Sequence, residues 1–301
     1  MRPQSVESRP IASWISAIAV IGTLAALVVA ERRRPLRCLM HEPKPRRNAR
    51  NLAVAALAAA AIQHAERPVT SRLTALVSRR RVGFVSRLNL PETARTATAC
   101  VLLDYTLYLW HVLTHRIPFL WRFHRVHHAD LDMDASTAIR FHFGEILASV
   151  AWRAVQIVLI GVTPRALSIW NTLLMVEVMF HHSNVQLSHR MERRLGKVIV
   201  TPRMHGIHHS IRQAEQDSNW SSGLTLWDWL HGTLRRDVPQ EQITIGVAEL
   251  RDPAQVTLPK LLAMPFRQRS GAIGQAAITI KPATQETPYR VLTEDEADHQ
   301  M

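Results

Sequence analysis

The chain has 301 residues, of which 47% are hydrophobic and 20% charged, so it is long enough for one sizeable domain or two small ones. Its formal net charge of +13 points to an acidic partner, either nucleic acid or an anionic lipid surface. The basic residues lie beside long apolar runs, at 31–50 and 67–87, which favours the lipid surface and argues against nucleic acid. With only Cys38 and Cys100, the chain has no disulfide framework and no CxxC metal site, so a metal would need nitrogen and oxygen ligands.

The first predicted element is a transmembrane helix within residues 1–31. Ala12 to Ala30 carries no charge and is long enough to cross a hydrocarbon core of about 30 Å. A cleaved signal peptide is the alternative, but this run is longer than a typical signal core and the positive charge follows it. The arginine cluster that begins at Arg32 predicts that the C-terminal end of the helix faces the cytoplasm.

Two further apolar segments precede the histidines. The block from Leu52 to Ile62 is short and rich in alanine, with basic residues on both sides, so it is either a buried span or a segment that dips into the membrane. The next helix is expected to begin at Pro91 and to continue beyond Trp110.

A helix pair is predicted at 146–162 and 165–180. Thr163 is a suitable N-cap for the second helix, and Pro164 suits its first position. Arg153 interrupts the first helix and is expected to face protein or an interface, because a charge in contact with lipid is costly. The same Thr-Pro helix start recurs at Thr201.

The last segment, residues 267–301, is predicted to be a disordered tail. From Gln268 it has few bulky apolar residues, and it ends in a polar, acidic stretch from Thr293.

Histidine spacing is the most informative feature of the sequence. Most of the 16 histidines lie between His111 and His209. They form one HxxxH motif, two HxxHH motifs and one adjacent pair: His111 and His115; His124, His127 and His128; His205, His208 and His209; His181 and His182.

These spacings predict a metal centre. On a helix, HxxxH directs two imidazoles to one side, and HxxHH spreads three over an arc of about 100°. Imidazole suits iron, copper, nickel and zinc. The eight imidazoles of the three motifs exceed the coordination number of one ion, which indicates two. No HExxH zinc-protease motif is present. The isolated histidines are interpreted as ordinary polar residues: His41, His64, His189, His231 and His299.

Candidate partners for the second ring nitrogens are acidic residues near the motifs. Asp104 shares a helical stripe with Tyr108, His111 and His115, and a ligating histidine usually donates its other N–H to a carboxylate or carbonyl. Asp228 and Glu145 are weaker candidates for this role.

Several segments around these histidines resemble a known family. They are Asp104-Tyr105, Trp110 to His115, Leu120 to His128, Arg140-Phe141-His142, His182-Ser183-Asn184, Thr201 to Ser210, Asp217-Ser218-Asn219, Trp227-Asp228 and Gly232-Thr233. In order and spacing they resemble the fatty acid hydroxylase/sterol desaturase superfamily, whose members are membrane-bound, histidine-rich diiron oxygenases. The resemblance covers roughly residues 32–266, which are expected to form the catalytic domain.

The resemblance implies an all-α fold: an integral membrane helical bundle, multi-pass, with a histidine-rich helical cap at the cytosolic face. It implies two iron ions, O2 as co-substrate, an external electron donor, and a lipid that is hydroxylated or desaturated. It leaves the lipid open among sterol, fatty acyl and alkylglycerol types.

The resemblance also assigns roles to residues. The implied metal ligands are His111, His115, His124, His127, His128, His182, His205, His208 and His209. His181 is the less favoured member of its pair, and His142 is expected to lie beside the ligands or face the substrate. Phe143-Gly144 replaces a proline common in the family, and His231 replaces an aromatic residue, which weakens any transfer of substrate identity.

Two other functions remain open from the sequence. A zinc-dependent membrane hydrolase would use the same imidazoles to hold a metal-bound hydroxide. A membrane metal-binding or transport protein without enzymatic activity would spread its ligands along a path across the bilayer.

Overall fold

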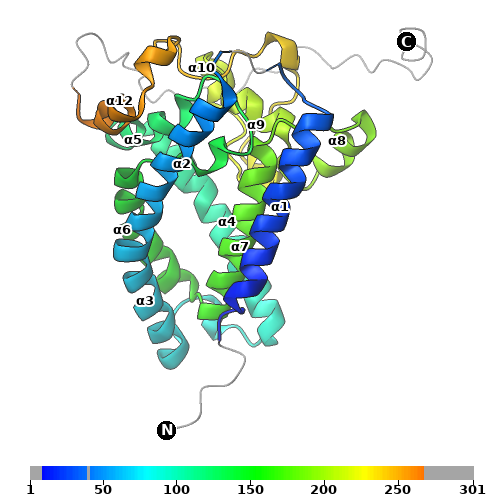
Figure 1. The fold of residues 1–301 in the computed structure, drawn as a ribbon. Helices are drawn as coiled ribbons and strands as arrows, with labels where there is room; N and C mark the ends of the chain where they lie inside the picture. Colours follow the sequence, from blue (N-terminus) through cyan, green and yellow to red (C-terminus); the bar gives the residue numbers. More distant parts are fainter. Residues whose placement is uncertain (1–8, 39–40, 268–301) are drawn as a thin grey trace. The chain divides into compact units, whose positions relative to one another are not determined.

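The computed structural model describes residues 9–38 and 41–267, and its regular elements are all helices (Figure 1). No strand occurs among these residues, so the predicted all-α class is confirmed for the described part of the chain. The expected disordered tail lies outside the described residues, apart from Arg267.

The first helix, α1 (Ser13–Arg33), packs along α7 (Pro164–His182). Hydrogen bonds hold its beginning in place: Ile11 N–H donates to Ser168 Oγ at 3.0 Å, and the hydroxyls of Ser16 and Thr172 lie 2.8 Å apart. By length and composition, two described helices could cross a membrane, α1 and α6 (Phe143–Ile160).

Helices α2 (Lys44–Ala61) and α3 (Arg67–Arg80) form one continuous rod. A π-helical turn, Ile62–Glu66, joins them, and the backbone keeps right-handed helical angles at both junctions. This rod lies beside α6 (Figure 1). The apolar block expected from Leu52 to Ile62 is therefore the middle of a longer helix, rather than a short separate segment.

The next helices are α4 (Glu92–Arg116), α5 (Pro118–His128), α6 and α7. The predicted break between α6 and α7 is confirmed. Gly161 ends α6 in the left-handed region with φ 88°, and Thr163 Oγ1 accepts a hydrogen bond from Ala166 N at 3.2 Å. Pro164 is the first residue of α7, because its fixed φ suits a helix start and its missing N–H needs no partner there.

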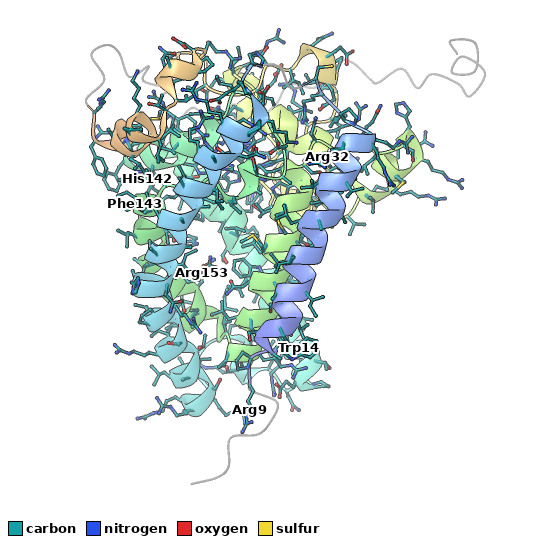
Figure 2. All side chains as sticks on the ribbon, viewed as in Figure 1. Arg9, Trp14, Arg32, His142, Phe143 and Arg153 are labelled. Atoms are coloured by element: carbon teal, nitrogen blue, oxygen red, sulfur yellow. The ribbon has the colours of Figure 1, made fainter. Side chains whose placement is uncertain are left out.

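An apolar core joins α3, α4, α6 and α7. Its buried side chains include Val77, Leu103, Ile157 and Trp170. Arg153 of α6 faces protein, as expected (Figure 2). Its guanidinium lies 4.5 Å from the Trp170 ring centroid and donates to Gln156 Oε1 at 3.1 Å, and its Nε lies 3.7 Å from a Glu66 carboxylate oxygen.

Short helices gather at the end of α4 that carries the histidines, at the upper end of the view in Figure 1. They are α8 (His189–Leu195), α9 (Pro202–His208), α10 (Gln213–Gln216), α11 (Leu226–Leu230) and α12 (Leu258–Ala263). Single 3-10 turns occupy Val85–Arg87, Thr137–Ile139, Gln240–Gln242, Pro253–Gln255 and Met264–Phe266. The second Thr-Pro start is also confirmed, since Thr201 caps α9 through Met204 N.

We expect Gly83→Ala to destabilise the protein. Gly83 has φ 92°, and a Cβ there would lie 2.3 Å from the backbone of Gly161. A strained backbone of this kind costs about 1–3 kcal/mol, and the steric overlap adds to it. The free energy of unfolding in detergent measures the effect. Gly22→Ala on α1 is the matched control, because nothing lies within 4 Å of its Cβ position. Equal stability of the two variants would contradict the packing described.

Candidate metal centre

Nine histidines from four helices meet in two neighbouring groups. In each group the nearest ring nitrogens all lie within 4.8 Å of one another. The first group is His111, His115, His124, His128 and His208; the second is His127, His182, His205 and His209. All nine are buried except His115, which is partly exposed. The structure thus brings together the nine residues that the family resemblance implied, while their role as ligands stays a prediction.

Each HxxHH motif is divided between the two groups. His124 and His128 of α5 point into the first group and His127 into the second, whereas His205 and His209 enter the second and His208 the first. The i and i+4 rings share one side of a helix, and the i+3 ring points away from them. Each motif therefore contributes to both groups. The rings of His128 and His209 stack across the boundary, with centroids 4.2 Å apart.

The ring nitrogens of the second group are spaced as ligands of one ion would be. His182 Nε2 lies 3.0 Å from His127 Nε2 and 3.0 Å from His205 Nε2. Two nitrogens bound to one ion at about 2.1 Å and at a right angle lie about 3.0 Å apart. The donor spacing therefore fits an imidazole-bound metal ion.

Many ring nitrogens at the centre are buried without a hydrogen-bond partner among the described residues. They include the Nε2 atoms of His115, His124 and His208, the Nδ1 atoms of His127 and His205, and both nitrogens of His128 and His209. An unpaired buried polar group is costly, and native proteins rarely leave one. Metal ions between the rings would satisfy one nitrogen of each ring, so the residues present fit the metal centre that the family resemblance implies.

Backbone carbonyls orient several of the rings. His111 donates from Nδ1 to Trp220 O at 2.7 Å, His208 to Ser218 O at 2.9 Å, and His182 to Val178 O at 2.8 Å. These bonds place the proton on Nδ1 and leave the Nε2 lone pair free for a metal. These acceptors could not be predicted from the sequence, because every residue has a carbonyl.

A carboxylate that contacts a histidine of the first group is Glu145, one of the two weaker candidates from the sequence. Its Oε1 accepts from His124 Nδ1 at 2.9 Å. Asp104, the favoured candidate, accepts instead from Leu224 N at 3.0 Å and from Trp227 Nε1 at 2.7 Å. Asp104 is thus placed to hold the segment that follows Trp220, because its position on α4 faces that segment.

Asp228 acts on the centre through the backbone. Its carboxylate accepts from Trp220 N at 2.9 Å and Ser221 N at 3.0 Å. The same Trp220 provides the carbonyl that orients His111. Asp228 therefore positions an acceptor and does not contact a ring.

His142 and His181 lie outside both groups. His142 caps α6, with Nδ1 accepting from Gly144 N at 2.9 Å, and packs against phenylalanine rings. In Figure 2 it lies beside Phe143. His181 packs on His205, with ring centroids 4.0 Å apart. Of the isolated histidines, His41, His64, His189 and His231 belong to neither group, and His299 lies outside the described residues.

A buried ionic network fixes the end of α5. Arg140 is fully buried and donates to the carbonyls of Val126 at 2.9 Å and Ala129 at 3.2 Å. Asp130 accepts from Asn51 Nδ2 at 3.0 Å and Thr137 Oγ1 at 2.9 Å. The last carbonyls of a helix lack partners within the helix, so this network completes the end of α5 and holds its histidines in place.

Burial lowers the pKa of the imidazoles on α5 and α9. For His127, His128, His205 and His209, burial is the larger cause and neighbouring histidines add to it, which brings their pKa values well below 6.5. Burial, followed by the charge of His124, lowers the pKa of His208 to about 3. These rings are therefore neutral at neutral pH, which is the state that binds metal.

Comparison with known proteins places the histidines inside a recognised domain. Residues 96–233 match the family described as fatty acid hydroxylase, and this segment contains all nine histidines of the two groups. No solved structure matches the chain.

Three relatives illustrate the similarity. Ornithine lipid hydroxylase OlsE of Rhizobium tropici is 29% identical over 158 residues, which are 52% of this chain and 46% of that protein. A cholesterol 25-hydroxylase-like protein of Danio rerio is 33% identical over 147 residues, 45% of this chain and 54% of that one. Alkylglycerol monooxygenase of Homo sapiens is 27% identical over 148 residues, which are 48% of this chain and 31% of that protein. The chain thus spans about half of these relatives' length, or less.

We expect Glu145→Gln to weaken metal binding about 10- to 100-fold, because loss of a carboxylate that orients a ligating histidine typically has this effect. Competition with a chelator during metal titration of the purified protein measures the affinity. Glu241→Gln, which removes an exposed carboxylate, is the control. Equal affinity in the two variants would show that the contact between Glu145 and His124 is not needed to hold metal.

We expect the metal-free protein to lose stability as the pH falls from about 6.5 towards 3. Histidines of the unfolded chain take up protons near pH 6.5. The buried rings stay neutral well below that value, with His208 titrating at about 3. The unfolded state therefore binds more protons in this window, and the free energy of unfolding decreases as the pH decreases. Denaturation of chelator-treated protein between pH 7.5 and 4.5 tests this. A flat profile would contradict it.

Proposed function

The chain belongs to the fatty acid hydroxylase/sterol desaturase superfamily, and from that premise we propose that it is a membrane-bound enzyme that hydroxylates a lipid with O2 at a centre of two iron ions. The observation that carries the proposal is the pair of neighbouring imidazole groups with unpartnered nitrogens. The relatives named above are lipid hydroxylases and monooxygenases, which supports hydroxylation as the reaction.

The number of imidazoles supports iron over zinc. Zinc sites in proteins are almost always four-coordinate, and catalytic ones take three protein ligands with water in the fourth position. The first group offers five imidazoles, which suits an ion of higher coordination number. The histidines also meet in one place, whereas a transport path would spread its ligands across the bilayer.

The outer surface of the helices supports a membrane location. Large apolar side chains are exposed on α1 and α6, among them Ile18, Ile21, Val155 and Leu159. Lipid would cover these side chains. At one end of α1 lie Arg9 and Trp14, and at the other lies Arg32 (Figure 2). Aromatic and basic residues at the two ends of an apolar helix are typical of the membrane–water interfaces.

The position of the arginines supports one side of the membrane for the metal centre. The cluster at Arg32, Arg33 and Arg34 ends α1 at the same end of the helices as α9 (Figure 1). Basic clusters that flank transmembrane helices are retained in the cytoplasm. We therefore place the histidine groups at the cytoplasmic face, where a soluble redox protein can supply electrons.

The overall reaction consumes one C–H bond of the lipid, one O2, two electrons and two protons, and yields the alcohol and one water. Bound iron would supply the activation of O2. The chain would hold the centre with imidazoles, orients them through Glu145 and the Trp220 and Ser218 carbonyls, and encloses them in a buried interior. A buried site also keeps bulk water away from the reacting carbon.

We expect the purified, iron-loaded protein with a reductant and ¹⁸O2 to add one labelled oxygen atom to a lipid from its host membrane. His128→Ala and His209→Ala should abolish the labelled product and lower the bound iron, because each removes a ring that has no other partner. Mass spectrometry of extracted lipids and metal analysis measure the two effects. His64→Ala, an exposed ring on the π-helical turn, is the matched control.

Two results would overturn the proposal. One is full iron content and lipid oxidation in both variants. The other is turnover that needs zinc and continues without O2, which would establish a hydrolase.

A further inference from the structure

A polar cavity of about 200 Å³ lies at the end of the helices far from the histidines. The last turn of α3, the first turns of α4 and the turn between α6 and α7 line it. Along α4, its lining residue Thr96 precedes His111 by fifteen residues, which corresponds to about 22 Å of helix. The cavity is therefore separate from the metal centre, and its role does not rest on the proposed function.

Part of the cavity lining is apolar. Val77, Val85 and Ala99 line it and belong to the buried core of the bundle. Beside them the Gly83 and Gly161 backbones pack in direct contact, since a Cβ on Gly83 would lie 2.3 Å from Gly161. Four chain segments thus meet around this space: the end of α3, the 3-10 turn Val85–Arg87, the start of α4, and the turn between α6 and α7.

The polar lining of the cavity is positively charged. Its lining residues include two arginines, Arg81 and Arg95, and one acid, Glu92, which is engaged in another interaction. Arg95 donates from Nη1 to the Leu90 carbonyl at 3.0 Å, which leaves its other guanidinium nitrogens as donors for a ligand. Arg81 also adopts a left-handed backbone with φ 53°, a conformation that glycine adopts at less cost. A strained arginine at the end of α3 points to a role for its side chain.

A hydroxyl in the lining has no partner. Ser78 Oγ is buried and makes no hydrogen bond among the described residues. A buried hydroxyl normally has a partner, which can be a ligand. Together with the two arginines of the lining, it places potential donors around one small space.

We propose that this cavity binds a phosphate group, either the headgroup phosphate of a membrane phospholipid or free inorganic phosphate. Guanidinium groups match phosphate oxygens through paired N–H donors, and the Ser78 hydroxyl adds a further donor. The volume accommodates a phosphate with its nearest substituent. Bound there, the phosphate would join the ends of α3 and α4 at the end of the bundle opposite the metal centre.

The test uses the purified full chain, stripped of lipid in an uncharged detergent. Inorganic phosphate, short-chain phosphatidylglycerol and diacylglycerol are titrated separately, and binding is measured by calorimetry and by the shift of the melting temperature. We expect at least one phosphate-bearing probe to bind and diacylglycerol not to bind. Binding of inorganic phosphate identifies a free-anion site, and binding of the phospholipid alone identifies a headgroup site.

Two double variants distinguish phosphate binding in the cavity from nonspecific attraction by surface charge. Arg81→Gln combined with Arg95→Gln should weaken phosphate binding about tenfold or more. Arg79→Gln combined with Arg80→Gln is the matched control, because it removes the same charge from exposed residues of α3 that do not line the cavity. The affinity of this control variant for phosphate should be unchanged.

Ser78→Ala distinguishes loss of the ligand from misfolding. It should weaken binding severalfold without lowering the melting temperature of the phosphate-free protein, because its hydroxyl has no internal partner to lose. The proposal is wrong if neither phosphate-bearing probe binds the unaltered protein. It is equally wrong if the control variant at Arg79 and Arg80 loses as much affinity as the cavity variant.

Discussion

The convergence of nine imidazoles in one interior is the constraint on which this structure depends. Rings such as His128 and His209 have both nitrogens buried without a partner among the described residues. Leaving such groups unpaired costs free energy, and charging them by protonation is opposed by burial and by the other rings. A bound metal ion would give one nitrogen of each ring a partner and would compete with protonation, so metal binding and stable folding of this region would be coupled.

The rest of the fold holds that interior together from several directions. The ends of α4 and α7 deliver rings from long helices, whereas α5 and α9 are short and depend on their surroundings. Arg140 completes the end of α5, and Glu145 reaches it from α6. The geometry of the centre is therefore tied to the packing of α6 and to the buried ionic network, not only to the histidines.

The helices separate two polar regions by an apolar middle. The histidine groups lie at one end, and the cavity lined by Arg81 and Arg95 lies at the other. Between them the core is apolar except for a few groups such as Arg153, which is paired with Gln156, Glu66 and the Trp170 ring. This arrangement suits a bundle whose middle lies in hydrocarbon and whose ends meet the two interfaces.

The sequence by itself determined the features that depend on neighbouring residues along the chain. Thr163 and Thr201 mark true helix starts, because capping is a local interaction, and the histidine motifs identify the rings that meet. Only the tertiary structure decided how each HxxHH motif is divided and that Glu145, rather than Asp104, contacts a ring. Spacing fixes the direction of a side chain relative to its own helix axis, but the partner it meets depends on how separate helices pack. The residue pattern cannot indicate which backbone carbonyl accepts a hydrogen bond, since every residue carries the same carbonyl.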